Sequence, residues 1–403
     1  MNKKLLIFLS ILITLVVLFP IVGSKLAEQT LNKQIEILKL NGLEIKNQNS
    51  DFKYFSTQLH YEFLIKDAQK FIQYINQKSN QKIPTAYDDI LEGTLVGIDI
   101  EHSNFMTDKD IEVDIYPLAL AKQLSKNREF NDFLQNRGLL YHINYNLLTQ
   151  DFSAYVKDID EEFILEDKTK ISLVVLKSRH SGNGNILKAN SFISNSEKIS
   201  LKSSEDSKNI NFLITNLALN YKTNNETKKI EFQMKTSFDN LLIASDEGFF
   251  NIVGFNYDIF VKDIDKDAMA ELEVYLSTIK TKYDLYSQQD AIEKSVMNLI
   301  TRGLTLSIED LSFKNIVINR SESLDSFSFK SKLILEKDSK FKTKNITTNI
   351  ELELSKKIFS QITAISPMVN LAKFYAKDKG DSFYFSIELK DDNLKVNNKK
   401  LSF

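Results

Sequence analysis

The sequence predicts an α+β fold in which an N-terminal transmembrane helix precedes an elongated body of curved antiparallel β-sheets with interspersed helices. Residues 5–22 form an apolar run without any charge. Many later segments alternate apolar and polar side chains, which is typical of strands with one buried face. Gly and Pro number only 11 and 4 among 403 residues. This scarcity favours long strands and helices joined by polar turns.

The N-terminal apolar run begins after Lys3 and Lys4 and would be about 27 Å long as a helix, close to the hydrocarbon thickness of a bilayer. It is longer than the apolar region of a secretory signal, and residues 22–24 make a poor cleavage site, so an uncleaved signal anchor is favoured over a cleaved signal. The two lysines place the short tail in the cytoplasm. We therefore expect a single-pass inner-membrane protein whose C-terminal bulk lies in the periplasm.

The pattern divides the chain into four parts. Residues 1–4 are a cytoplasmic tail, residues 5–22 the transmembrane anchor, residues 23–160 an extracytoplasmic α+β region, and residues 161–403 a β-rich region. Leu59, Tyr61 and Phe63 alternate with polar residues in a clear strand. Helices are expected from Pro117 to about Gly138, over residues 288–302 and over residues 358–376.

One short motif recurs. Residues 155–160 (YVKDID) reappear as residues 260–265 (FVKDID), with a weaker copy at residues 64–68. Such a repeat is either a duplicated binding edge or a strand-to-helix corner capped by Asp. The corner is favoured because Asp is a preferred N-cap. An internal duplication is consistent with both interpretations.

Composition excludes several kinds of site. The absence of Cys removes disulfides, iron–sulfur clusters, thiolate zinc sites and cysteine nucleophiles. The net charge of −2 argues against a nucleic-acid partner. Asp263, Asp265 and Asp267 begin like a calcium loop, but Ala268 and Val274 replace its Gly and Glu. We predict no catalytic residue, no cofactor and no metal, and therefore a protein that is not an enzyme.

The four histidines also fail to form a recognisable motif. His60, His102, His142 and His180 are scattered, and none has the partner four residues away that a zinc helix requires. His60 and His142 fall on the polar faces of predicted strands.

The aromatic and aliphatic side chains of two distant segments suggest an apolar groove. We hypothesise that one face of the sheet forms a long trough. It would be lined by Leu59, Tyr61, Phe63, Phe383, Phe385 and Ile387. The more ordinary interpretation is that these residues form a closed sheet core.

Three short motifs resemble the YdgA/YihF-like family of membrane-anchored bacterial envelope proteins. They are residues 23–28 (GSKLAE), residues 42–45 (GLEI) followed by 52–56 (FKYFS), and the terminal residues 394–401 (LKVNNKKL). Tyr54 and Asn398 replace glycines of the family pattern. The resemblance implies an inner-membrane anchor and an extracytoplasmic β-rich body, without established catalytic residues. A more distant likeness, of architecture only, is to AsmA-like envelope proteins, whose β-grooves are associated with lipid movement.

These observations lead to three functional hypotheses. The first is a non-enzymatic envelope protein that binds or moves lipid or another amphiphile along an apolar sheet face. The second is an interaction or scaffolding module that binds an envelope protein or forms a homo-oligomer through exposed strand edges. The third is a hydrolase whose carboxylates no motif marks.

Overall fold

The computed structural model describes most of the chain after residue 34. The described residues are 35–52, 56–78, 87–103, 110–120, 127–164, 168–185, 188–205, 208–224, 228–278, 286–319, 325–338 and 345–400. They form two compact units, one of residues 1–217 and 243–247 and the other of residues 218–242 and 248–403. Strands β11 (Lys208–Asn224) and β12 (Lys229–Ser245) contribute residues to both.

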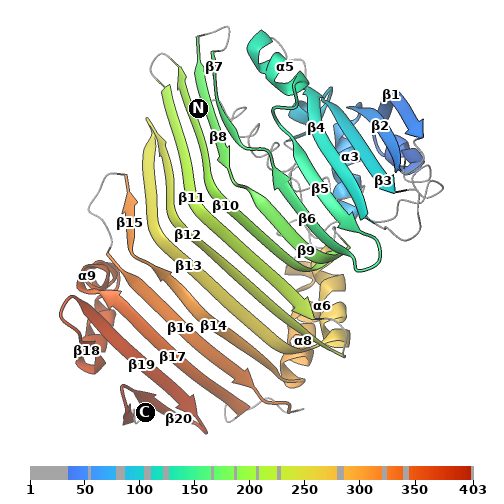
Figure 1. The fold of residues 1–403 in the computed structure, drawn as a ribbon. Helices are drawn as coiled ribbons and strands as arrows, with labels where there is room; N and C mark the ends of the chain where they lie inside the picture. Colours follow the sequence, from blue (N-terminus) through green and yellow to red (C-terminus); the bar gives the residue numbers. More distant parts are fainter. Residues whose placement is uncertain are drawn as a thin grey trace. The chain divides into compact units, whose positions relative to one another are not determined.

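The first unit is an antiparallel meander followed by two bent strand pairs (Figure 1). Strands β1 (Leu43–Phe52), β2 (Ser56–Ile65), β3 (Leu95–Ser103), β4 (Asp110–Ala119), β5 (Tyr141–Asn146) and β6 (Asp151–Val156) pair in that order. Strand β6 then pairs with β9 (Arg179–Asn185), and β7 (Ile159–Ile164) pairs with β8 (Lys170–Leu176). Strand β10 (Lys188–Glu205) pairs with both β8 and β9.

One face of this sheet is covered and forms the core. Helix α3 (Ala68–Lys78) buries Phe71, Ile72 and Ile75 against the sheet, and Asp67 caps its start by accepting a hydrogen bond from Lys70 N. The short helix α4 (Asp88–Leu91) and helix α5 (Arg128–Gln135) also join this cluster. The opposite face of β2–β5 carries polar side chains, which leaves room for a polar site.

The YVKDID copy forms a bend between two strands and no helix follows it. Asp158 lies between β6 and β7, and its Oδ1 accepts a hydrogen bond from the backbone N of Lys177, 2.8 Å away, between β8 and β9. Both strand pairs are therefore interrupted at the same place. In the second copy, Asp265 rather than Asp263 caps the following helix, through a 3.1 Å hydrogen bond from Ala268 N.

The second unit is also built on antiparallel strands. Strand β13 (Gly248–Asp265) pairs with β14 (Leu304–Phe313) and β15 (Asn315–Ile318), and β14 pairs with β16 (Phe327–Leu335). The order continues through β17 (Ile346–Ser355), β19 (Ser382–Lys390), β20 (Asn393–Val396) and β21 (Lys399–Lys400), while the short β18 (Lys377–Asp378) pairs with β19.

Two pairs of helices accompany these strands. Helices α6 (Lys266–Thr278) and α8 (Gln289–Thr301) pack on each other, and α6 contacts β13. Helix α9 (Lys356–Ile365) contacts β17 and β19 and packs against η4, a 3₁₀ helix (Pro367–Tyr375). The helix predicted over residues 358–376 is thus two segments, since Pro367 cannot continue the hydrogen bonding of α9.

The predicted α+β class behind a transmembrane helix is wrong, and so is the single-pass inner-membrane location with a periplasmic bulk. The described residues are mainly antiparallel strand, because the amphipathic stretches of β10–β13 pair as strands of 17–18 residues. None of the helices in the described ranges has the length and apolar character needed to cross a bilayer. Residues 5–22, to which the sequence assigns the anchor, lie outside the described residues.

The helix predicted to begin at Pro117 is also wrong. Pro117 lies in β4, opposite Val96 and next to a register shift in the β3–β4 pairing. On its other side, the pairing of β4 with β5 ends at Ile115. Pro is tolerated here because the ladder needs no N–H from this residue. The helix that ends near Gly138 is the shorter α5.

Candidate functional site

A straight row of polar side chains crosses the open face of the first unit. Each member faces the next on a neighbouring strand, because the antiparallel registers of β1–β6 and β9 align them. The members are Asn49, His60, Asp99, Asp114, His142, Tyr155 and Arg179. We call this set the central polar row. It brings together residues up to 130 positions apart in the sequence (179 − 49).

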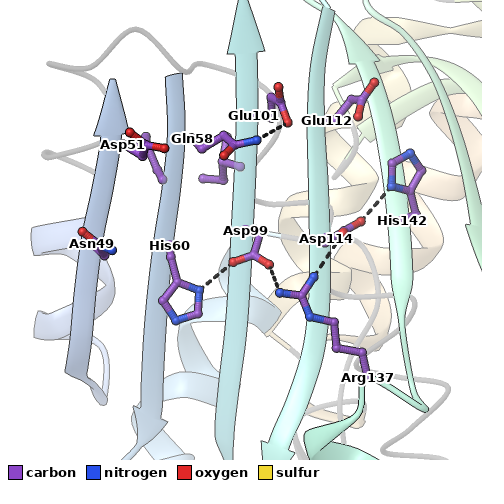
Figure 2. A pocket seen from close by; sticks show the side chains of 12 residues that line it. Asn49, Asp51, Gln58, His60, Asp99, Glu101, Glu112, Asp114, Arg137 and His142 are labelled. Atoms are coloured by element: carbon purple, nitrogen blue, oxygen red, sulfur yellow. Dashed lines mark hydrogen bonds and ion pairs between the residues drawn. The ribbon is translucent and has the colours of Figure 1, made fainter. Parts of the chain in front are cut away.

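Arg137 joins the two carboxylates at the middle of the row. Figure 2 shows its guanidinium between Asp99 and Asp114, with Nη2 2.5 Å from Asp99 Oδ2 and Nη1 3.7 Å from Asp114 Oδ2. The two histidines flank the carboxylates: His60 Nδ1 lies 2.6 Å from Asp99 Oδ1, and His142 Nδ1 lies 2.7 Å from Asp114 Oδ1. An ionised carboxylate can only accept hydrogen bonds. The Nδ1 atom of each histidine therefore carries a proton and donates a hydrogen bond to the neighbouring carboxylate.

The end of α5 fixes the position of Arg137. Gly138 N donates to Phe133 O and Arg137 N donates to Leu134 O, the two hydrogen bonds of a Schellman motif. Arg137 therefore takes the left-handed position, with φ 53°, that is usually occupied by Gly. A side chain here costs about 1 kcal/mol. We expect the ion pairs with Asp99 and Asp114 to offset this strain.

The ring of Tyr116 lies under the guanidinium of Arg137. Its ring centroid lies 4.3 Å from Arg137 Cζ, and its hydroxyl donates to Asp99 Oδ2 at 3.0 Å. Tyr116 is opposite Gly97 in the β3–β4 register. The absence of a side chain at Gly97 lets the ring lie on the strand. Burial, followed by the negative charge of Asp99, raises the pKa of Tyr116, so the hydroxyl stays protonated and donates.

The electrostatics of the row favour protonation of His60. Burial alone would lower its pKa, but hydrogen bonds to Asp99 and to Glu62, 3.3 Å from Nε2, outweigh burial and raise the pKa. His60 is therefore a group whose charge responds to pH near neutrality.

A pocket of about 460 Å³ opens beside this network. Its ionisable lining comprises the carboxylates Asp51, Asp99, Glu101, Glu112 and Asp114, the guanidinium of Arg137 and the imidazoles of His60 and His142. Glu101 and Glu112 face each other across β3 and β4, and Gln58 Nε2 donates to Glu101. Within the described ranges, no three such side chains are placed to hold a metal ion. The pocket can accept hydrogen bonds from a polar group, but an acidic lining alone does not define a ligand.

A second surface of interest is one face of the second unit. The registers of β13, β14, β16, β17 and β19 align apolar side chains in neighbouring rows. One row contains Tyr257, Leu311, Phe329, Leu352 and Phe385. The next contains Ile259, Ile308, Ser331, Ile350 and Ile387, and a third contains Val261, Leu306, Leu333, Thr348 and Leu389. We call these three rows the apolar face.

The apolar face is mostly half-buried. Of its members, only Phe385 is buried, and none of the 18 residues of β13 is. On the same face, Phe255 stacks on Phe238 of β12, with ring centroids 4.8 Å apart. The reverse face is polar, with ion pairs such as Lys235–Asp258 and Lys395–Glu388. This part of the unit is thus an amphipathic sheet whose apolar side is incompletely covered.

One end of the apolar face is closed by α9 and η4. Ile358 and Phe359 of α9 are buried together with Leu354, Phe383 and Phe385. The rings of Phe359 and Phe383 meet edge to face at 4.9 Å. This small cluster is the described core of that end of the unit.

Five of the six residues of the predicted groove are buried in hydrophobic clusters. Leu59, Tyr61 and Phe63 are buried in the core of the first unit, on the side of the sheet opposite the central polar row. Phe383 and Phe385 are buried in the cluster under α9, while Ile387 is half-buried on the apolar face. Among the six, only Ile387 thus remains a candidate for contact with a ligand.

Sequence reasoning did not find the central polar row. Alternation places His60 and His142 on polar strand faces, and the same alternation holds for Asp99 and Asp114. A signal was present, since consecutive strands each carry one ionisable residue at a central polar position. The pairing that makes them neighbours depends on register, which alternation does not give.

No protein-family model, curated protein or solved structure matches this chain. The resemblance to the YdgA/YihF-like family stays a prediction.

Proposed function

We propose that the protein binds the hydrocarbon part of a lipid or similar amphiphile on the apolar face of the second unit. The observation that carries this proposal is the set of three contiguous rows whose aliphatic and aromatic side chains are almost all half-buried. A contiguous apolar surface that stays partly accessible to solvent is a candidate interaction site. Each methylene group that such a surface removes from water contributes about 0.8 kcal/mol.

The shape of the surface favours a chain-like ligand over a compact one. The rows run across at least five strands without a charged side chain. A flexible alkyl chain can follow such rows, because apolar contacts are not directional. The rival, a partner protein docked on the same rows, would also bury them.

The experiment compares adjacent residues of β16 that point to opposite faces. Leu333 lies in the apolar face, and Lys332 is exposed on the polar side. Native mass spectrometry of the full chain purified with its lipids, and titration with a fluorescent fatty acid, measure bound amphiphile in L333E and K332E. We expect L333E to lose most of the binding and K332E to keep it.

The melting temperature controls for unfolding. If L333E is destabilised, the milder L333S replaces it and should weaken binding at an unchanged melting temperature. Retention of amphiphile by a folded L333E, or absence of bound amphiphile in the unmodified protein, would contradict the proposal. A stoichiometric protein in place of lipid would favour the interaction-module hypothesis.

A further inference from the structure

We infer that the α9–η4 end of the second unit docks onto a lipid bilayer that contains anionic lipids. This inference goes beyond the proposed function, and it would stand even if the apolar face held no amphiphile. It starts from apolar side chains of these two segments that face solvent. Phe374 is 78% exposed, Leu371 59% and Ile362 41%.

These exposed side chains belong to a firmly attached element. Val369, Ala372 and Ala376 point inward and pack on the cluster formed by Phe359 and its neighbours. Asn397 Nδ2 donates to Tyr375 O at 2.6 Å and so ties the end of η4 to the strands. The outward apolar residues are therefore a second, solvent-facing side of η4. A surface segment that is apolar on both sides needs a partner for the outer one.

The charge around this apolar side identifies the partner. Residues 356–379 contain five lysines, Lys356, Lys357, Lys373, Lys377 and Lys379, and a single acidic residue, Asp378. Asp378 pairs with Lys356, and Lys379 pairs with Glu353, so positive charge remains in excess around η4. The whole chain, in contrast, has a net charge of −2. Aromatic and aliphatic side chains flanked by lysines are the composition of segments that lie in a bilayer interface with anionic headgroups. A protein partner with an acidic rim is the alternative that the experiment separates.

The α9–η4 docking surface lies at one end of the apolar face. The same α9 and η4 close one end of the apolar face, through Phe359 and its contacts with Phe383 and Phe385. If the end formed by α9 and η4 rests on a bilayer, the apolar face lies next to a source of acyl chains. Docking and amphiphile binding are nevertheless separate events, because they use different side chains.

The experiment uses the absence of Cys in the chain, which allows one introduced Cys to be labelled uniquely. The full-length variant F374C carries an environment-sensitive fluorophore and is mixed with vesicles. The vesicles are phosphatidylcholine alone or an equimolar mixture of phosphatidylcholine and phosphatidylglycerol. Leu148, 65% exposed in a turn of the first unit, gives the matched control L148C. Because the label reports its own surroundings, binding by any other segment does not mask the result.

We expect a blue shift and quenching by spin-labelled lipid at position 374 with the anionic vesicles, and neither at position 148. High salt should reduce the signal, since screening weakens surface charge attraction. The double substitution K373Q/K377Q should weaken it severalfold. The matched change K330Q/K332Q on the polar face of β16 should not.

An unchanged probe at position 374 with anionic vesicles would overturn the inference, and so would equal shifts at positions 374 and 148. Binding of fluorescent fatty acid by the same preparations tells the two proposals apart. If the fatty acid binds but the probe at 374 stays in water, docking is wrong and the proposed function is retained. If the probe enters the bilayer but no fatty acid binds, the proposed function fails and docking is retained.

Discussion

Gly97 and Tyr116 face each other across β3 and β4, and the ring of Tyr116 occupies the space that a side chain at Gly97 would need. A Cβ built on Gly97 would lie only 2.4 Å from Tyr116 Cε2 and 2.7 Å from Cζ. Sequence alternation would place a polar side chain at position 97. Its absence lets the ring support Arg137 and lets the hydroxyl reach Asp99.

The substitution G97A should therefore destabilise the first unit by about 1–3 kcal/mol, because the ring must leave its position. Urea unfolding measures this cost. In a Y116A background the same substitution should cost much less, since the obstructing ring is gone. Equal costs in both backgrounds would show that the contact does not limit position 97.

Arg137 allows strain and charge to be separated. R137A removes the ion pairs with Asp99 and Asp114 but keeps a side chain at φ 53°, whereas R137G also relieves the strain. We expect R137A to lose about 1–2 kcal/mol, because Asp99 and Asp114 then face each other without the cation. R137G should lose about 1 kcal/mol less than R137A.

The control for the charge effect is D114N in the R137A background. Removal of one of the two facing carboxylates should restore part of the stability that R137A loses. Measured free energies of unfolding test this expectation. If R137A is as stable as the unmodified protein, the bridge does not stabilise the sheet.

His60 should make the first unit more stable at mildly acidic than at alkaline pH. Its pKa is raised because hydrogen bonds to Asp99 and Glu62 outweigh burial, which by itself would lower it. The protonated imidazole therefore stabilises the fold fully below the unfolded value of about 6.5. This contribution is lost as pH rises through the folded pKa. The difference in unfolding free energy between the unmodified protein and H60Q should shrink as pH rises, and a constant difference would contradict this assignment.

His180 should behave in the opposite way. Burial lowers its pKa to about 4, and Phe192 stacks on its ring with centroids 5.9 Å apart. The neutral form therefore stabilises the fold above the unfolded pKa of about 6.5, and this contribution is lost as pH falls toward 4. The shift corresponds to up to about 3 kcal/mol. In H180F, the unfolding free energy should fall less steeply as the pH is lowered. An NMR titration that places the pKa of His180 near its ordinary value would contradict the prediction.

The sequence predicts local structure well where one short segment decides it. The alternation around Tyr61 predicts a strand, and β2 is that strand. The segment 64–68 predicts a corner with Asp67 as cap, and Lys70 N confirms the cap. These features depend on residues within a few positions of one another, so that alternation and capping rules suffice.

The candidate sites depend on contacts that no local rule provides. His60 and Asp99 are 39 positions apart, and their contact requires the β2–β3 register. Arg137 reaches the row because a helix ends in a left-handed Arg, for which the sequence pattern would predict Gly. Likewise, alternation in β14 and β16 predicts an apolar face but not whether helices cover it. That is why Leu59 and Phe383 could be assigned to one groove although they lie in separate cores.

The last prediction concerns Asn397 and Asn398, which the sequence predicts as a tight turn. The turn is confirmed: both residues have positive φ, 47° and 65°, and Val396 pairs with Lys399 across it. N398G should be neutral or stabilise slightly, because Gly adopts this conformation without strain. N398V should destabilise, since a β-branched side chain resists positive φ.

Asn397 has the same backbone conformation but a different role. Its Oδ1 accepts a hydrogen bond from Ser386 N, and its Nδ2 donates to Tyr375 O and Tyr384 O. N397G keeps the backbone preference and removes these bonds, so we expect a loss of about 1–3 kcal/mol. Because one bond holds the end of η4, hydrogen exchange should also rise in residues 369–376 of N397G and stay unchanged in N398G. Similar stability and exchange in the two variants would mean that the turn conformation, and not the Asn397 side chain, fixes η4 to the strands.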